Sequence, residues 1–180
     1  MKPTGIVRRI DDLGRVVIPK EIRRTMRIRE GDPLEIYTDK DGEIIFKKYS
    51  PVGELTGYAA QICETLNKTT GCGVCMCDRD MVVAMSGTFR RDLIEKRISE
   101  DLENLMESRQ LYQYKPDEKK IKISEESDKH WIGVSAPIIS EGDVSGCLIF
   151  VMSEGTQPPR ETEFKLAQAV SGFLGKQLEN

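Results

Sequence analysis

The chain has 180 residues, of which 38% are hydrophobic and 32% charged, and this composition is typical of a soluble globular protein with one ordinary domain or two small ones. No apolar run approaches the roughly 20 residues of a membrane span, and the N-terminus shows no signal peptide, so we expect a cytoplasmic protein without a membrane partner. Five cysteines, an odd number, argue against a disulfide framework, and the single histidine, His130, disfavours a histidine-based metal site or a Ser-His-Asp triad.

The overall charge of −3 hides an uneven distribution along the chain. Residues 1–29 carry nine Lys and Arg against three acidic residues, which gives +6. Residues 51–180 carry 15 basic and 21 acidic residues, which gives −6. A basic segment on an acidic chain predicts that the basic segment binds a polyanion such as DNA.

The first fifty residues, called the head from here on, predict four short strands and one helix. Pro19 ends a β-branched run and suits the first turn of a helix over residues 20–27. Gly14 gives a first turn its conformational freedom, and residues 39–42 (Asp-Lys-Asp-Gly) form a hairpin turn. The expected strands are residues 6–10, 15–18, 34–38 and 43–49.

A unit as small as the head buries little surface and is marginally stable by itself. It contains no cysteine, so it has no disulfide to stabilise it, and it shows no evident metal site. We therefore expect the head to dimerise, with hairpins that interleave between two chains.

Ser50-Pro51 marks the end of the head, residues 51–55 are expected as a linker, and residues 56–180 as a second domain. A helix in this region carries an apolar seam with 3-4-3-4 spacing, formed by Val52, Leu55, Ala59, Ile62 and Leu66. Such a seam packs either on its own domain or against a partner helix. Because it follows a head that already needs a partner, we favour the dimer role.

The remaining chain predicts an α/β domain. A hairpin is expected over residues 73–86, a helix over 90–106 and a polar excursion over 110–129 with a short strand at 121–123. Two apolar strands, residues 131–139 and 145–152, precede a final helix that opens at Pro158-Pro159.

The head closely resembles the AbrB-type swapped-hairpin regulators. The resemblance is carried by residues 5–19 (GIVRRIDDLGRVVIP), by Lys20-Glu21-Ile22-Arg23-Arg24, and by the later Gly31-Asp32 and Asp41-Gly42. It implies two chains that interleave into one β-barrel-like dimer and bind double-stranded DNA through arginines. These are Arg8, Arg15, Arg23 and Arg24, with Arg9 beside them. We expect Asp11 and Asp12 to hold the turn and orient arginines rather than contact DNA.

Residues 55–180 resemble a GAF domain, a sensory α/β module, in their length, their helical ends and the late hairpin over residues 135–150. No nucleotide-binding motif of that family is recognisable. The combination of both domains is similar to the stage V sporulation protein T family, which implies a regulator of forespore genes. The expected fold class is thus α+β with two domains, a swapped-hairpin head and a GAF-like domain, assembled as a homodimer or a homotetramer.

Candidate sites in the second domain are less specific. Cys72, Cys75 and Cys77 lie within six residues, but without a second CxxC pair we favour inert core thiols over metal or redox chemistry. We expect no catalytic residue, metal or cofactor. A pocket for an unknown small molecule is predicted from six residues: Met76, Asp78, Ser86, Gly87, Trp131 and Ser135.

The sequence therefore predicts a non-enzymatic, DNA-binding transcription regulator, an activator or repressor located in the cytoplasm on the nucleoid. One alternative is an antitoxin-like binding protein, because the same hairpin fold serves antitoxins. The other is a cysteine-based reductase built on the GAF fold.

Overall fold

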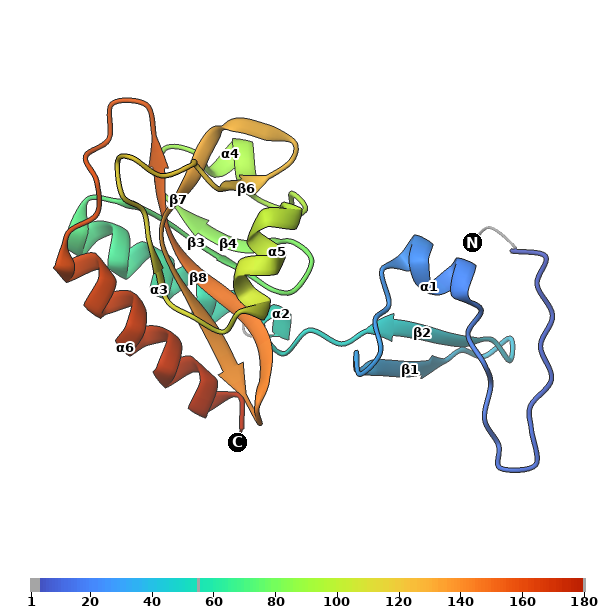
Figure 1. The fold of residues 1–180 in the computed structure, drawn as a ribbon. Coiled ribbons are helices and arrows are strands. Elements are labelled where there is room, and N and C mark those ends of the chain that lie inside the picture. Colours follow the sequence, from blue (N-terminus) through green and yellow to red (C-terminus); the bar gives the residue numbers. More distant parts are fainter. Residues whose placement is uncertain (1–3, 55, 180) are drawn as a thin grey trace. The chain divides into compact units, whose positions relative to one another are not determined.

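The computed structural model describes residues 4–54 and 56–179 and divides the chain into two compact units, residues 1–49 and residues 50–180 (Figure 1). The first unit corresponds to the head. Among the described helices, none combines the length and the apolar character that a membrane crossing requires.

The predicted helix and second hairpin of the head are present. Helix α1 (Lys20–Met26) follows Pro19, whose φ of −56° suits a helix start, and ends at Arg27 in the left-handed conformation, one residue earlier than predicted. Strands β1 (Leu34–Thr38) and β2 (Ile44–Lys48) pair antiparallel, with Ile36 opposite Phe46. In the turn between them, Asp39 Oδ1 accepts hydrogen bonds from the backbone N–H groups of Asp41 and Glu43.

The two strands predicted for residues 6–10 and 15–18 are not formed in this single chain, which corrects the prediction. A strand is stabilised by backbone hydrogen bonds to a neighbouring strand. The described residues 4–18, called the arm from here on, have no such neighbour in the single chain. In the described residues 4–18, both backbone–backbone hydrogen bonds belong to the turn: Asp11 N to Arg15 O and Gly14 N to Asp11 O, each 3.0 Å. The β-branched arm is thus an extended hairpin without a pairing strand.

The second unit is built on an antiparallel sheet. The long central hairpin confirms the two late apolar strands and extends them at both ends. The sheet consists of β3 (Gly73–Cys77), β4 (Val82–Ser86), β5 (Tyr112–Gln113), β6 (Lys122–Ser124), β7 (Ser127–Ser140) and β8 (Asp143–Ser153). Their order in the sheet is β4-β3-β8-β7-β5, with β6 paired to β7.

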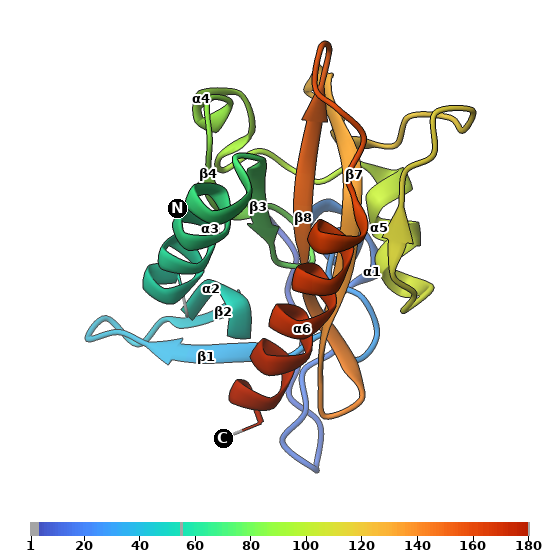
Figure 2. The ribbon, with the colours of Figure 1, turned by 90° about the vertical axis from the view of Figure 1, so that its left-hand side faces the viewer.

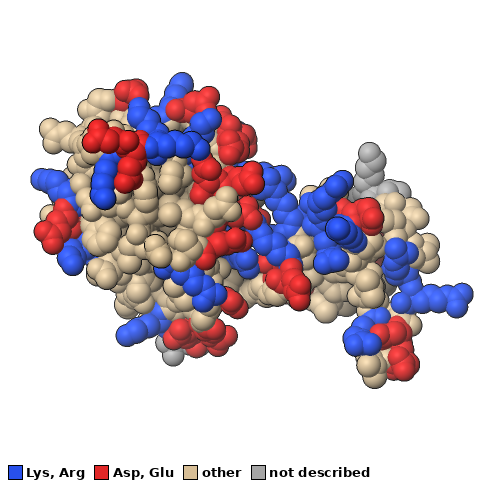
Figure 3. Space-filling view, viewed as in Figure 1, with Lys and Arg blue, Asp and Glu red and all other residues tan. Residues whose placement is uncertain are grey.

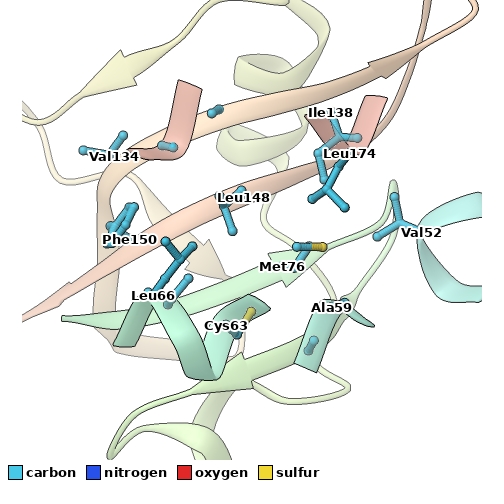
Figure 4. Close-up of a cluster of buried hydrophobic side chains, with 14 residues drawn as sticks. Val52, Ala59, Cys63, Leu66, Met76, Val134, Ile138, Leu148, Phe150 and Leu174 are labelled. Atoms are coloured by element: carbon cyan, nitrogen blue, oxygen red, sulfur yellow. The ribbon is translucent and has the colours of Figure 1, made fainter. Parts of the chain in front are cut away.

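Helices cover both faces of this sheet. Helices α3 (Thr56–Thr70) and α6 (Glu161–Gln177) lie on one face, as Figures 1 and 2 show. Their side chains join one apolar core with the strands, drawn in Figure 4. The other face packs against α4 (Arg90–Leu93) and α5 (Glu100–Glu107) through a second core.

The single helix predicted over residues 90–106 is wrong, because the structure divides it into α4 and α5. Glu95 between them has a φ of +59°, which a helix cannot contain, and Arg97 forms a β-bridge with Met81. Ser99 then starts α5, its hydroxyl accepting a hydrogen bond from Leu102 N at 3.0 Å.

The dimer role predicted for the apolar seam is also wrong. Val52, Ala59 and Leu66 are 2%, 1% and 5% exposed and pack against the unit's own sheet, with Ile62 at the edge of the same core. Leu55 lies outside the described residues. Residues 51–54 form the short helix α2 (Pro51–Glu54) with Val52 buried, so this part of the expected linker belongs to the second unit.

Candidate nucleic-acid interface

The turn of the arm holds one of the five predicted arginines in a fixed geometry. Asp11 Oδ1 accepts hydrogen bonds from the N–H groups of Leu13 (3.0 Å) and Arg15 (2.7 Å), and its Oδ2 accepts one from Arg15 Nε (2.8 Å). The backbone N–H of Arg15, and then its side chain, lower the pKa of the Asp11 carboxyl below its ordinary value. The Arg15 side chain is still 69% exposed, so the carboxylate orients it without covering it.

The other four predicted arginines are exposed as well. Arg8 donates one hydrogen bond from Nη1 to the carbonyl oxygen of Val7 (3.1 Å). Arg23 and Arg24 are consecutive in α1, a helix in which no residue is buried. Figure 3 shows Lys and Arg side chains over the surface of the head. Arginine forks presented in this way can reach phosphates or base edges.

The head also exposes apolar side chains, and none of its described residues is buried. Val7, Val17 and Leu13 are 84%, 70% and 69% exposed. Other large apolar residues of the head are more than a third exposed: Ile6, Ile10, Val16, Met26, Ile36, Ile44 and Phe46. A surface this apolar is typical of a protein–protein interface. Sequence reasoning identified the need for a partner from the size of the head but did not single out these residues.

Five of the six residues predicted to line a pocket are buried in the sheet or hold local structure, and they do not line the cavity described below. Met76 and Ser135 are each 1% exposed within the sheet. Trp131 packs with Tyr114 and Met152, and its indole Nε1 is buried without a hydrogen-bond partner among the described residues.

The two remaining polar residues of that set stabilise local structure. Asp78 Oδ1 accepts hydrogen bonds from the N–H groups of Asp80 and Met81, both at 2.8 Å, and its Oδ2 accepts one from Ser50. Ser86 donates to Asn67 Oδ1 at 3.3 Å.

Gly87, the sixth residue, lines a cavity of about 770 Å³ in the second unit. The same cavity contacts Arg160 and Glu163 at the start of α6, together with Phe150 and Gly133 of the sheet. Sequence reasoning missed these four residues. Pro158-Pro159 signals a helix start near Arg160, but no sequence signal shows that Gly133 of β7 and Phe150 of β8 line the same cavity.

The cysteines lie mainly in the two cores. Four of the five are buried, and Cys72 is half-buried. Burial raises the pKa of Cys63 to about 12, and it raises the pKa of Cys75 well above its ordinary value. A hydrogen bond with Cys147, together with burial, does the same for Cys77. Thiolates, the reactive form, are therefore strongly disfavoured at these three positions.

The sequence model of the stage V sporulation protein T C-terminal domain, described as a transcription factor, matches residues 54–179. Stage V sporulation protein T of Bacillus subtilis is 46% identical to this chain over 99% of both proteins. The chain belongs to the stage V sporulation protein T family. This confirms the predicted family and the prediction of a transcription regulator of sporulation.

The head of the chain also matches proteins over its own residues alone. The N-terminal DNA recognition domain of AbrB from B. subtilis is 67% identical over 28% of this chain and 94% of that one, with a TM-score of 0.25, so the likeness rests on sequence identity. A second sequence model, that of the bacterial antitoxin MazE (antidote-toxin recognition), matches residues 7–54. The predicted AbrB-like class of the head is confirmed.

The second unit of the chain shares its fold with GAF domains. The GAF domain of a phosphoenolpyruvate-protein phosphotransferase from Coxiella burnetii is 15% identical, covers 69% of this chain and 82% of its own, and has a TM-score of 0.52. At this identity the likeness shows the fold alone, and it confirms the GAF-like class predicted for residues 56–180.

Proposed function

We propose that this chain regulates forespore genes by binding double-stranded DNA as a homodimer, through Arg8, Arg9, Arg15, Arg23 and Arg24 of the head. The observation that supports this most directly is the 67% identity of the head to a DNA recognition domain, combined with the exposure of these five arginines. The net charge of +6 over residues 1–29 adds a sequence-independent attraction to phosphates. Such a protein acts in the cytoplasm, on the nucleoid.

Dimerisation follows from the lack of a core in the head. Its exposed apolar side chains and the unpaired arm fit a second copy of the same arm, which would supply both the missing strand neighbour and the buried surface. Residues 1–50 thereby provide DNA binding and dimerisation. Residues 56–180 provide a further self-association surface, giving a homotetramer whose two DNA-binding dimers bind with increased avidity, and they sense a signal.

The test compares Arg23→Ala, Arg24→Ala and the double variant with Arg91→Ala, an exposed arginine of the second unit, on DNA fragments captured genome-wide by the full chain. Removing an arginine that binds one phosphate should lower the slope of log affinity against log salt by about one unit. The Arg91 variant should match the unaltered chain. Unchanged affinity in both single variants and in the double variant would refute the arginine assignment.

An antitoxin is the second candidate, because the MazE model matches residues 7–54. Antitoxins of this type wrap a toxin with an extended tail, whereas residues 50–180 form a folded unit with its own cores. Deletion of the gene distinguishes the two: loss of a sporulation regulator should leave vegetative growth normal and reduce spore formation, while loss of an antitoxin should arrest growth.

We also propose that the chain is not an enzyme. The reductase alternative needs accessible thiolates, and Cys75, Cys77 and Cys147 are fully buried. The unaltered chain should therefore show no turnover of methionine sulfoxide that replacement of Cys75 by Ser would abolish. The same replacement should leave DNA binding unchanged.

A further inference from the structure

Helix α3 ends and helix α6 begins at the same end of the sheet (Figures 1 and 2). The cavity of the second unit is lined by residues of both helices there. Asn67 and Thr70 belong to the last turns of α3, and Arg160 and Glu163 to the start of α6. A volume of about 770 Å³ is within the range of small-molecule sites, roughly 300–1,000 Å³. On the opposite face, side chains of α5 such as Leu102 and Met106 fill the space against the sheet.

Three glycines shape the inner wall. A Cβ on Gly73 would lie 3.0 Å from Cε2 of Phe89, and one on Gly133 would lie 2.8 Å from Cγ of Met152. Gly87 has a φ of +128°, and a Cβ there would lie 3.0 Å from the Cα of Gly73. Met152 therefore packs directly on β7 beside Phe150 and gives the cavity an apolar wall on the face of α3 and α6, while Phe89 and Val151, which also touch the cavity, pack in the core of the opposite face.

Most polar groups around the cavity are already engaged in structural hydrogen bonds. Asn67 Nδ2 donates to the carbonyl oxygen of Cys72 (2.7 Å), and its Oδ1 accepts from Ser86. The hydroxyl of Thr70 donates to the carbonyl oxygen of Leu66, and that of Thr156 to the carbonyl oxygen of Ser153. These groups hold the fold, and the hydroxyl donors of Thr70 and Thr156 are not available to orient a ligand.

Arg160 is the charged group of the lining that keeps unused donors. Glu163, with a side chain only 2% exposed, accepts hydrogen bonds from Arg160 Nη2 (3.1 Å) on Oε1 and from Arg160 N (2.7 Å) on Oε2. The remaining donors of the Arg160 guanidinium have no partner in the described part of the chain, and its side chain is 73% exposed. A buried carboxylate thus holds a cation at the cavity with most of its hydrogen-bonding capacity unused.

We infer that this cavity binds a small monocarboxylate with an apolar body. The carboxylate would pair with the free donors of Arg160, and the body would pack on Phe150 and Met152. The cavity lining has one cation and one anion, and both oxygens of the anion are already used. An ammonium group therefore finds no free carboxylate, and the single arginine, already paired with Glu163, cannot neutralise a phosphate dianion.

The test uses the full-length chain without DNA, so it is independent of the proposed function of the head. The probes are 3-phenylpropanoate and 4-methylpentanoate, each compared with its uncharged amide, with binding followed by saturation-transfer NMR and titration calorimetry. The acids should bind at least about tenfold more tightly than the amides, because the amides cannot form the charge-assisted hydrogen bond. This comparison uses the unaltered protein and does not depend on a variant folding.

The matched variants are Arg160→Gln and, outside the cavity, Arg91→Gln. Arg160→Gln should weaken binding of the acids at least about tenfold and leave the amides unchanged, while Arg91→Gln should bind both like the unaltered chain. The inference is overturned if neither acid binds at millimolar concentration, if the amides bind as tightly as the acids, or if Arg160→Gln binds the acids normally.

Discussion

The two units of this chain place their apolar residues in opposite ways. Every buried hydrophobic side chain among the described residues lies in the second unit, at Val52 or later, while the head exposes Val7, Val17 and Leu13 by more than two thirds. Both units contain paired strands and a helix, so secondary structure does not separate them. The difference is that the second unit is stabilised by its own cores, whereas the head lacks a core in a single chain.

The two units should therefore respond differently to mutation. A unit with its own core responds to mutation by losing stability, because cavities form in a close-packed interior. A unit that lacks a core depends on a partner chain, so the same kind of mutation should act on assembly and on DNA affinity together.

The largest effect is expected from a charge placed on the arm of the head. Val17→Asp puts an unpaired carboxylate where we propose that a second chain covers the arm, and burying such a charge costs several kcal/mol. We expect loss of the dimer and a DNA affinity lower by more than about 100-fold. Light scattering and fluorescence anisotropy measure the two effects.

Val17→Ile is the matched control, since it retains the β-branched apolar character and should remain dimeric. Residues 1–50 alone should also be dimeric. A Val17→Asp chain that is still dimeric at micromolar concentration would contradict the proposed role of the arm.

A smaller effect, confined to one unit, is expected from the core of the second unit. Leu102 is fully buried between α5 and the sheet, so Leu102→Ala should lower the free energy of unfolding by about 2–5 kcal/mol. Glu107→Ala, on the exposed side of the same helix, should change it by less than about 0.5 kcal/mol. Denaturant unfolding gives both values, and DNA affinity under native conditions should be unchanged; a large loss of affinity would show that the units are not separable.

The smallest effect concerns two carboxylates that each pair with an arginine. Burial raises the pKa of Glu163, but the hydrogen bonds and charge of Arg160 outweigh it, so the pKa lies below its ordinary value of 4.5. As the pH falls below 4.5, Glu163 binds a proton in the unfolded chain before it does so in the folded one. The stability that Glu163 contributes is therefore complete above pH 4.5 and is lost as the pH falls through the lower pKa of Glu163 in the folded chain.

Glu163→Gln should therefore flatten the acid-induced decrease in the unfolding free energy of the second unit. Asp11 also has a lowered pKa, but it lies on the arm of the head, outside the second unit, so Asp11→Asn should leave this pH profile unchanged. Equal effects of the two substitutions on this profile between about pH 5 and pH 3 would argue against the Glu163–Arg160 pair as the cause.

Local chemistry made several elements predictable. Pro19 before Lys20 and the Asp39–Gly42 turn located α1 and the β1–β2 hairpin, because the proline ring and the turn residues act through their own backbone. The family was predictable from the residues of the arm for the same reason: they are contiguous. The break between α4 and α5 was not, since the apolar spacing of Ile94, Ile98 and Leu102 continues across Glu95.

The sequence alone determined the basic head, the positions of its arginines and the family, and it predicted a partner chain, since charge, contiguous motifs and the size of a unit are properties of the chain itself. Only the tertiary structure decided what the seam of Val52, Ala59 and Leu66 packs against, because the same spacing suits a partner helix or the unit's own sheet. It also decided where the cavity lies. Residues of α3, α6 and three sheet strands meet there, and contacts between such distant segments arise from packing, which local sequence patterns do not record.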